Sequence, residues 1–173
     1  ATAYTLAWAI RRIGPFDLIL CGRQAIDGDT GQVGPGIARQ LGITQPTYVS
    51  KIPKIDLQDG RVCVERLLEE GREIVEAPLP ALLTVLKDIN QPRAPTFMRM
   101  RRARRAKIPV WSASDLTEEG AEGRFFGLEG SPTRVVKVFS PPQREGQAEI
   151  IETQEVSKAA KALVERLVAE RIV

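Results

Sequence analysis

The chain has 173 residues, of which 43% are hydrophobic and 27% are charged, a composition typical of one globular domain that can bury a core. It contains no histidine and two cysteines, Cys21 and Cys63, which excludes Ser-His-Asp and Cys-His nucleophiles and disfavours a metal-spaced pair or a disulfide. No run of about 18 apolar residues is present, so we expect no membrane span or signal peptide, and a cytoplasmic location.

The first two predicted elements are a helix and a strand. Apolar residues recur at helical spacing from Ala1 to Ile13, and Gly14-Pro15 ends that pattern. The apolar run Phe16 to Cys21 is typical of a buried parallel strand. We expect the helix to cover one face of this strand and Cys21 to be a buried thiol.

A glycine-rich loop, Gly22 to Pro35, connects this strand to a predicted helix from Gly36 to Leu41, which Gly42 closes. The order strand, glycine-rich loop, helix is the layout that binds a nucleotide phosphate, because the helix's first N–H groups face the anion. A plain connecting loop is the alternative, although such a loop does not need so many polar side chains. Neither the P-loop lysine nor a GxGxxG pattern is present, which argues against a kinase, an ATPase or a standard dinucleotide dehydrogenase.

The next part of the chain predicts an antiparallel portion on a parallel core. Three strands are expected over Thr47 to Ile55, Arg61 to Leu68 and Arg72 to Ala77, because Asp59-Gly60 and Glu70-Gly71 are hairpin signals. The continuous apolar run Ala81 to Leu86 then predicts a strand covered on both faces. Ligands of such sheets bind beyond the carboxyl ends of the strands, so the loop after Leu86 is expected near the glycine-rich loop.

A basic segment, Arg93 to Lys107, holds seven of the 25 basic residues and no acid, so the rest of the chain carries 18 basic against 22 acidic residues. Three interpretations remain open. The segment is a solvated helix face, a docking site for an acidic protein, or a nucleic-acid site. Nucleic-acid binding is disfavoured because Phe97 is the one aromatic residue interleaved with the charges.

The C-terminal part predicts an arm rather than a domain. We expect short strands over Ile108 to Trp111 and Thr133 to Phe139, a helix start at Ser112 to Leu116, and a final amphipathic helix from Val156. This arm has too little apolar residue content to form its own core, so we expect it to pack on another chain. The predicted division is therefore residues 1–117 for the α/β domain and 118–173 for the linker and arm.

Three stretches together resemble the electron transfer flavoprotein beta subunit, in the branch that includes bifurcating and nitrogen-fixation-associated members. They are Asp17 to Pro35, Arg66 to Thr84, and Asn90 to Arg93 running into the basic helix. The resemblance implies a Rossmann-like parallel sheet with helices on both faces, an antiparallel hairpin portion and a C-terminal arm. Glu70 departs from the family pattern, which has Gly or Asp there. The family also begins with a strand and helices that this chain lacks, so Ala1 would fall inside the domain.

The same resemblance implies an electron-carrier subunit that binds AMP, or FAD in the bifurcating branch, which would place it in a flavin-based, NADH-dependent complex. The pattern Gly28-Asp29-Thr30 resembles the FAD type. Asp29 would cap the loop's own N–H groups or bind a ribose hydroxyl. No acid or base catalyst is expected, since the flavin carries the electron chemistry. The predicted cofactor-binding residues are Gly22, Arg23, Gln24, Asp29, Thr30, Gly31, Gln32 and Val33.

The implied partners are an alpha subunit, on which the arm packs, and an acyl-CoA-type dehydrogenase or a quinone reductase. By its place in the motif, Phe97 would insert into a pocket of the dehydrogenase, and packing of Phe97 on its own domain is the alternative. The basic residues expected around the anchor are Arg99, Arg101, Arg102 and Arg105. A non-redox adenine-nucleotide module of the stress-protein type is the alternative function for the whole chain.

Overall fold

The computed structural model describes residues 1–141, 150–151 and 155–172. The chain divides into two compact units, Ala1–Arg134 and Val135–Val173, and each is described by itself. The first unit contains the sheet and all the residues predicted to bind a cofactor. The functional division predicted at residues 117/118 stays a prediction.

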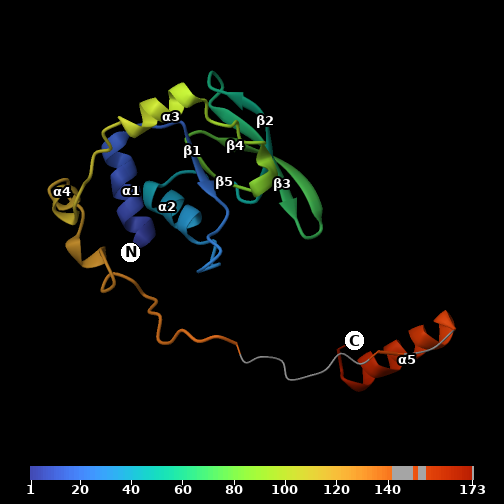
Figure 1. Cartoon of the computed structure of the whole chain (residues 1–173). Coiled ribbons are helices and arrows are strands. Elements are labelled where there is room, and N and C mark those ends of the chain that lie inside the picture. The colour runs from blue at the N-terminus through green and yellow to red at the C-terminus, as the bar shows by residue number, and fades with distance from the viewer. Residues whose placement is uncertain (142–149, 152–154, 173) are drawn as a thin grey trace. The chain divides into compact units, whose positions relative to one another are not determined.

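The first unit is built on a five-stranded mixed sheet in the order β1-β5-β2-β3-β4 (Figure 1). Strands β1 (Leu18–Gly22) and β5 (Ala81–Val85) are parallel, and β2 (Val49–Asp56) is parallel to β5. Strands β3 (Arg61–Leu68) and β4 (Gly71–Pro78) continue the sheet in antiparallel pairs. The α/β class, the parallel core and the antiparallel hairpin portion are therefore confirmed.

The two hairpin turns form where the glycine dipeptides predict them. Gly60 and Gly71 both have positive φ, 63° and 141°, values that cost a residue with a side chain more than glycine. The first turn is closed by Asp56, whose Oδ1 accepts hydrogen bonds from the N–H groups of Gln58 and Asp59 at 3.1 and 3.0 Å. Local hydrogen bonding of an aspartate is a common way to fix a turn.

Helices α1 (Thr2–Ile13) and α2 (Val33–Leu41) lie on one face of the sheet (Figure 1). Their buried residues form one core with Leu82, and the partly buried residues packed against it include Ile19 and Cys21 of β1. The predicted cover of the first strand by the first helix is confirmed. Gly42 ends α2 in the left-handed conformation, with φ 71°, as its position predicts.

The opposite face of the sheet carries a second core of Val49, Val62, Val64, Ala77, Ala81 and Leu83. A short 3-10 turn, η1 (Lys87–Ile89), contributes Ile89 to the residues packed against this core. Helical elements thus flank both faces, although the larger ones share one face. Four of the five residues of β5 are buried, as the continuous apolar run predicts.

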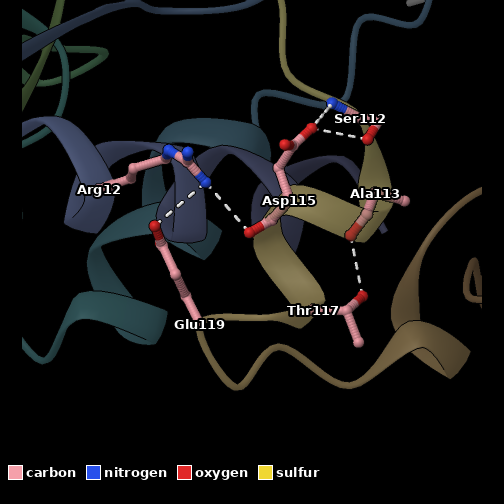
Figure 2. Close-up of polar contacts among 6 residues, drawn as sticks. All are labelled: Arg12, Ser112, Ala113, Asp115, Thr117 and Glu119. Atoms are coloured by element: carbon pink, nitrogen blue, oxygen red, sulfur yellow. Dashed lines mark hydrogen bonds and ion pairs between the residues drawn. The ribbon is translucent and has the colours of Figure 1, made fainter.

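Beyond the sheet, α3 (Phe97–Arg104) follows Thr96, whose Oγ1 accepts a hydrogen bond from the Arg99 N–H at 3.4 Å. The short helix α4 (Ala113–Thr117) has Ser112 as its N-cap residue and is joined to α1 by Arg12 (Figure 2). Arg12 Nη1 donates to the Asp115 carbonyl at 3.0 Å and pairs with Glu119 Oε1 at 3.1 Å. These contacts fix the chain after the basic segment against the N-terminal helix.

A small aromatic cluster extends the same contact. The Tyr4 ring lies 5.1 Å from the Phe125 ring and 5.6 Å from the Phe126 ring, and the Tyr4 hydroxyl accepts a hydrogen bond from the Glu122 N–H at 2.8 Å. Phe125 belongs to a 3-10 turn, η2 (Gly123–Phe125). Tyr4 is therefore a packing residue.

Two predicted strands are wrong. Residues 108–111 and 133–139 form no strand, and their apolar side chains other than that of Trp111 are exposed, including Val110 at 91% and Val136 at 95%. A strand requires a hydrogen-bonding neighbour, which neither segment has among the described residues. The second unit contains the predicted final helix, α5 (Val156–Ala169). No helix in the described ranges has the length and apolar character needed to span a bilayer.

Candidate functional site

The glycine-rich loop forms one side of a polar pocket of about 430 Å³ at the carboxyl ends of β1 and β5. Seven loop and helix residues line it, and Thr47, Tyr48 and Thr84 complete it. The seven are Arg23, Gln24, Asp29, Thr30, Gly31, Gln32 and Pro35. Six of the eight residues predicted to bind a cofactor therefore line one pocket.

The other two predicted residues lie beside this pocket. Gly22 lines a neighbouring pocket of about 700 Å³ together with Arg23, Gln24 and the segment from Val85 to Asn90. Val33 is the first residue of α2 and lines neither pocket. Because Arg23 and Gln24 line both pockets, the two spaces adjoin at this point. The segment after β5 therefore lies near the glycine-rich loop, as predicted.

A short chain of side-chain hydrogen bonds gives the loop its shape. Arg23 Nε donates to Gln24 Oε1 at 2.8 Å, and Gln24 Nε2 donates to Asp29 Oδ1. The Asp29 N–H donates to the Ala25 carbonyl at 3.0 Å. These bonds join Asp29 to residues 23–25 at the start of the loop. Within the described residues the Asp29 carboxylate does not accept from the loop's N–H groups, so the predicted cap is not formed.

The backbone of the loop presents a row of free donors. Asp29 and Gly31 have positive φ, 50° and 62°, and alternation of left- and right-handed residues turns successive N–H groups toward one point. Within the described part of the chain, the N–H groups of residues 30–34 donate no hydrogen bond. Free N–H groups at the start of a helix, where the dipole is positive, attract an anion. This donor set fits a phosphate.

The opposite wall of the pocket comes from residues that the sequence analysis missed. Tyr48 has φ 57°, its N–H donates to Thr84 Oγ1 at 3.3 Å, and its carbonyl accepts from the Leu67 N–H at 2.9 Å. The Arg23 guanidinium lies over the Tyr48 ring, 4.9 Å from its centroid, a cation–π contact. In the sequence, Thr84 is a polar residue within an apolar run, which is a weak indication of a role in the site. No feature of the sequence indicates such a role for Tyr48.

The remaining chemistry of the site favours binding over covalent catalysis. Burial raises the pKa of the Cys21 thiol, which keeps it protonated and a poor nucleophile at neutral pH. Cys21 is half-buried, less than predicted, and both cysteines are free. No group of three or more His, Cys, Asp or Glu side chains in the described ranges could hold a metal ion.

The predicted partner-binding residues lie on or directly after α3, whose side chains are all exposed. Phe97 is 72% exposed, so its ring is not packed on its own domain. Arg101, Arg102 and Arg105 line a shallow groove of about 540 Å³ with Met98 and Ala106, and Arg99 lies outside it. None of these four arginines forms an ion pair with the residues described, so their charges face solvent.

Comparison with known proteins gives consistent results. The family model "Electron transfer flavoprotein domain" matches residues 1–116. The chain is 42% identical over 180 residues to the electron transfer flavoprotein subunit beta of Megasphaera elsdenii, covering 100% of this chain and 64% of that protein. It is 44% identical over 171 residues to Protein FixA of Bradyrhizobium diazoefficiens, covering 96% of this chain and 58% of FixA.

A third relative is the Caffeyl-CoA reductase-Etf complex subunit CarD of Acetobacterium woodii, 39% identical over 173 residues, with 100% of this chain and 63% of CarD covered. The chain spans about three fifths of the length of these curated relatives. The family match extends over the sheet, the glycine-rich loop and α3. This chain is therefore a member of the electron transfer flavoprotein domain family.

Proposed function

We propose that this chain is the nucleotide-binding part of an electron transfer flavoprotein beta subunit, which with an alpha subunit carries electrons between a dehydrogenase and an acceptor. The observation that carries the proposal is the row of free N–H groups at residues 30–34, which lead into α2, in a chain of this family. Such a row is suited to a nucleotide phosphate. The pocket residues would bind and orient the nucleotide.

The roles of individual residues follow from their donors and acceptors. The N–H groups of Thr30 to Val33 would hold the phosphate oxygens, and the Thr30 hydroxyl and the Gln32 amide would add hydrogen bonds. Asp29 keeps one carboxylate oxygen on the Gln24 amide, so its other oxygen is available to a ribose hydroxyl. A bound flavin would supply the redox chemistry, while this chain supplies position and electrostatics.

FAD is the proposed cofactor, and AMP is the alternative. A pocket of about 430 Å³ takes a mononucleotide, whereas the adjoining pocket of about 700 Å³ offers room for a larger dinucleotide. One relative is named as a subunit of a caffeyl-CoA reductase-Etf complex. This name, together with the pattern Gly28-Asp29-Thr30, supports the bifurcating type.

The proposed partners are the alpha subunit and an acyl-CoA-type dehydrogenase or a quinone reductase. In α5, Val156, Leu163, Val164 and Val168 are 50% exposed or more, and an amphipathic helix without a core needs an apolar partner. We assign α5 and the rest of the arm predicted from residue 118 to the alpha subunit, apart from residues 119–126, which contact α1 of this chain. Phe97, with Arg99, Arg101, Arg102 and Arg105 around it, is assigned to the dehydrogenase.

The test is the nucleotide content of the full-length heterodimer. Nucleotides released by acid from the purified complex are separated and counted per heterodimer. Two FAD support the proposal, and one FAD with one AMP overturns the bifurcating type. A colourless monomer that binds ATP overturns the redox function in favour of a stress-protein-type module.

A variant pair locates the nucleotide on this chain. Gly31→Val places a β-branched side chain at φ 62°, whereas an added Cβ at Gly28 has nothing within 4 Å. We expect Gly31→Val to lose one nucleotide per heterodimer and Gly28→Ala to keep both. Equal contents in the two variants would remove the loop from the binding site.

A further inference from the structure

Arg66 on β3 makes contacts that the proposed function does not use. Its Nε donates to the Thr47 carbonyl at 2.8 Å, its Nη2 donates to Thr47 Oγ1 at 3.1 Å, and its Nη1 bonds to Glu73 Oε2 at 2.8 Å. Its side chain is 25% exposed, against 48% for Glu73. One guanidinium thus joins β4 to the residue that precedes Tyr48, using the planar fork that only arginine has.

Tyr48 needs such support because of its backbone. Its φ of 57° lies in the left-handed region, which a bulky residue occupies only where its surroundings hold it there. The contacts to its own peptide groups come from Thr84 and Leu67. Arg66 adds two bonds to the preceding residue, one to the main chain and one to the side chain.

The held conformation determines one wall of the pocket. Tyr48 is 40% exposed, and its ring lies beneath the Arg23 guanidinium, which also bonds to Gln24. The contacts therefore run without a break from Glu73 through Arg66, Thr47 and Tyr48 to the glycine-rich loop. We propose that Arg66 is a positioning residue of the nucleotide site, which holds the Tyr48 turn so that the Tyr48 ring and Arg23 form the wall facing the loop; this rests on the proposed function.

Arg72 in the same hairpin is a matched control that distinguishes a positioning role of Arg66 from a purely structural one. Arg72 on β4 pairs with Glu65 on β3 at 2.8 Å, the same kind of cross-strand ion pair that Arg66 forms with Glu73. Arg72 makes no contact with Thr47 among the described residues. Loss of either ion pair should affect stability similarly, but only loss of Arg66 should change the Tyr48 turn.

The experiment uses the full-length heterodimer with Arg66→Gln, Arg66→Lys, Glu73→Gln and Arg72→Gln, and with AMP and FAD as probes. Tyr48 is observed directly by fluorine NMR of fluorotyrosine-labelled protein, in which the Tyr48 signal is the one that Tyr48→Phe removes. Tyr4, which is remote from Arg66 in sequence and packs on α1 and residues 122–126, is the internal reference. Thermal unfolding of each variant is recorded alongside.

We expect Arg66→Gln to raise the nucleotide Kd about ten-fold, the loss expected for hydrogen bonds to a charged group, and to shift the Tyr48 signal but not that of Tyr4. Arg66→Lys should behave alike, because an ammonium cannot replace the fork; it carries the test if Arg66→Gln does not fold. Glu73→Gln and Arg72→Gln should leave Kd within about three-fold.

Two outcomes separate this inference from the proposed function. If the wild-type complex binds neither probe at this site but the Tyr48 signal still moves in the Arg66 variants, the proposed function fails and the Arg66–Tyr48 link stands. If the wild type binds and the Arg66 variants match Arg72→Gln in Kd and in the Tyr48 signal, the positioning role is overturned and the proposed function stands.

Discussion

Gly34 shows how closely α2 approaches the sheet. A Cβ built at this position would lie 2.6 Å from Thr84 Cγ2, well inside van der Waals contact, and Thr84 is 3% exposed on a strand covered on both faces. Because Thr84 is buried and cannot move away, the absence of a side chain at Gly34 determines the distance between α2 and β5. The same distance places the N–H groups before α2 above the carboxyl ends of the strands.

Gly34→Ala should therefore displace α2 and weaken the site. We expect a loss of about 1–3 kcal/mol in the free energy of unfolding, as for other overpacked cores, together with weaker nucleotide binding. Denaturant unfolding and nucleotide titration of the full-length complex measure the two effects. Gly123→Ala is the control, because an added Cβ there meets nothing within 4 Å; equal stability of the two variants would show that the helix adapts without cost.

At the residue scale the sequence predicts six of the ten residues that line the pocket. Glycines and polar side chains between an apolar strand and a helix identify the loop, because phosphate binding requires these residue types there. Tyr48 and Thr47 are not predictable in this way, because they reach the pocket through the pairing of β2 with β5. The left-handed conformation of Tyr48 is set by Thr84, Leu67 and Arg66, which are distant in sequence.

Among the elements, α4 has only five residues, so its stability depends on side-chain contacts rather than on helix length. The Ser112 N–H and hydroxyl both donate to Asp115 Oδ2 at 2.6 Å (Figure 2), and these bonds, chiefly that from the hydroxyl, hold the pKa of Asp115 below its usual range. Arg12 then joins the helix to α1. Charge on Asp115 is therefore part of what keeps α4 folded.

Acid should release this helix. Since the folded-state pKa of Asp115 is lowered, its contribution is fully present above the ordinary aspartate pKa of about 3.9 and is lost as pH falls through the lower folded value. As pH is lowered, we expect the NMR signals of residues 112–117 to shift in the same step in which the Asp115 carboxyl is protonated. Asp115→Asn should abolish that step, whereas Glu118→Gln should retain it; a step that survives in Asp115→Asn would assign it to another group.

The prediction of elements succeeded where local chemistry and tertiary pairing agree. The hairpins around Gly60 and Gly71 are confirmed because the turn residues and the alternating strands specify the same structure. The segments 108–111 and 133–139 have equally good β-formers, such as Val110 and Val136, but no partner strand among the described residues. A high strand propensity means that a residue fits well into a sheet, but it does not by itself form a strand where no neighbouring strand is present.

For the first unit as a whole, the strongest charge feature is α3 and the residues around it. The segment 93–107 holds seven basic residues and no acidic one, whereas the rest of the whole chain holds 18 basic and 22 acidic residues. The arginines of α3 are exposed and form no ion pair with the residues described. Phe97 and Met98 are exposed among them, at 72% and 68%. An apolar side chain surrounded by positive charge suits a partner surface with an apolar pocket and an acidic rim.

Phe97 and the arginines around it should therefore affect different steps when the full-length heterodimer binds its dehydrogenase: Phe97 the dissociation rate, and the arginines the association rate. Phe97→Ala should cost about 2 kcal/mol or more, mostly through faster dissociation, because a buried aromatic anchor is lost. The triple change Arg101→Gln, Arg102→Gln and Arg105→Gln should slow association and flatten its dependence on salt, because long-range attraction is lost.

Met98→Ala is the matched control for Phe97, since it removes a neighbouring exposed apolar side chain of the same helix. Both association and dissociation rates are obtained by surface-based or stopped-flow measurement at two or more salt concentrations. If Phe97→Ala and Met98→Ala weaken binding equally, α3 presents a general apolar surface rather than one anchor. If Phe97→Ala leaves affinity and electron transfer unchanged, the anchor assignment is wrong, and the arginines alone would account for recognition by this helix.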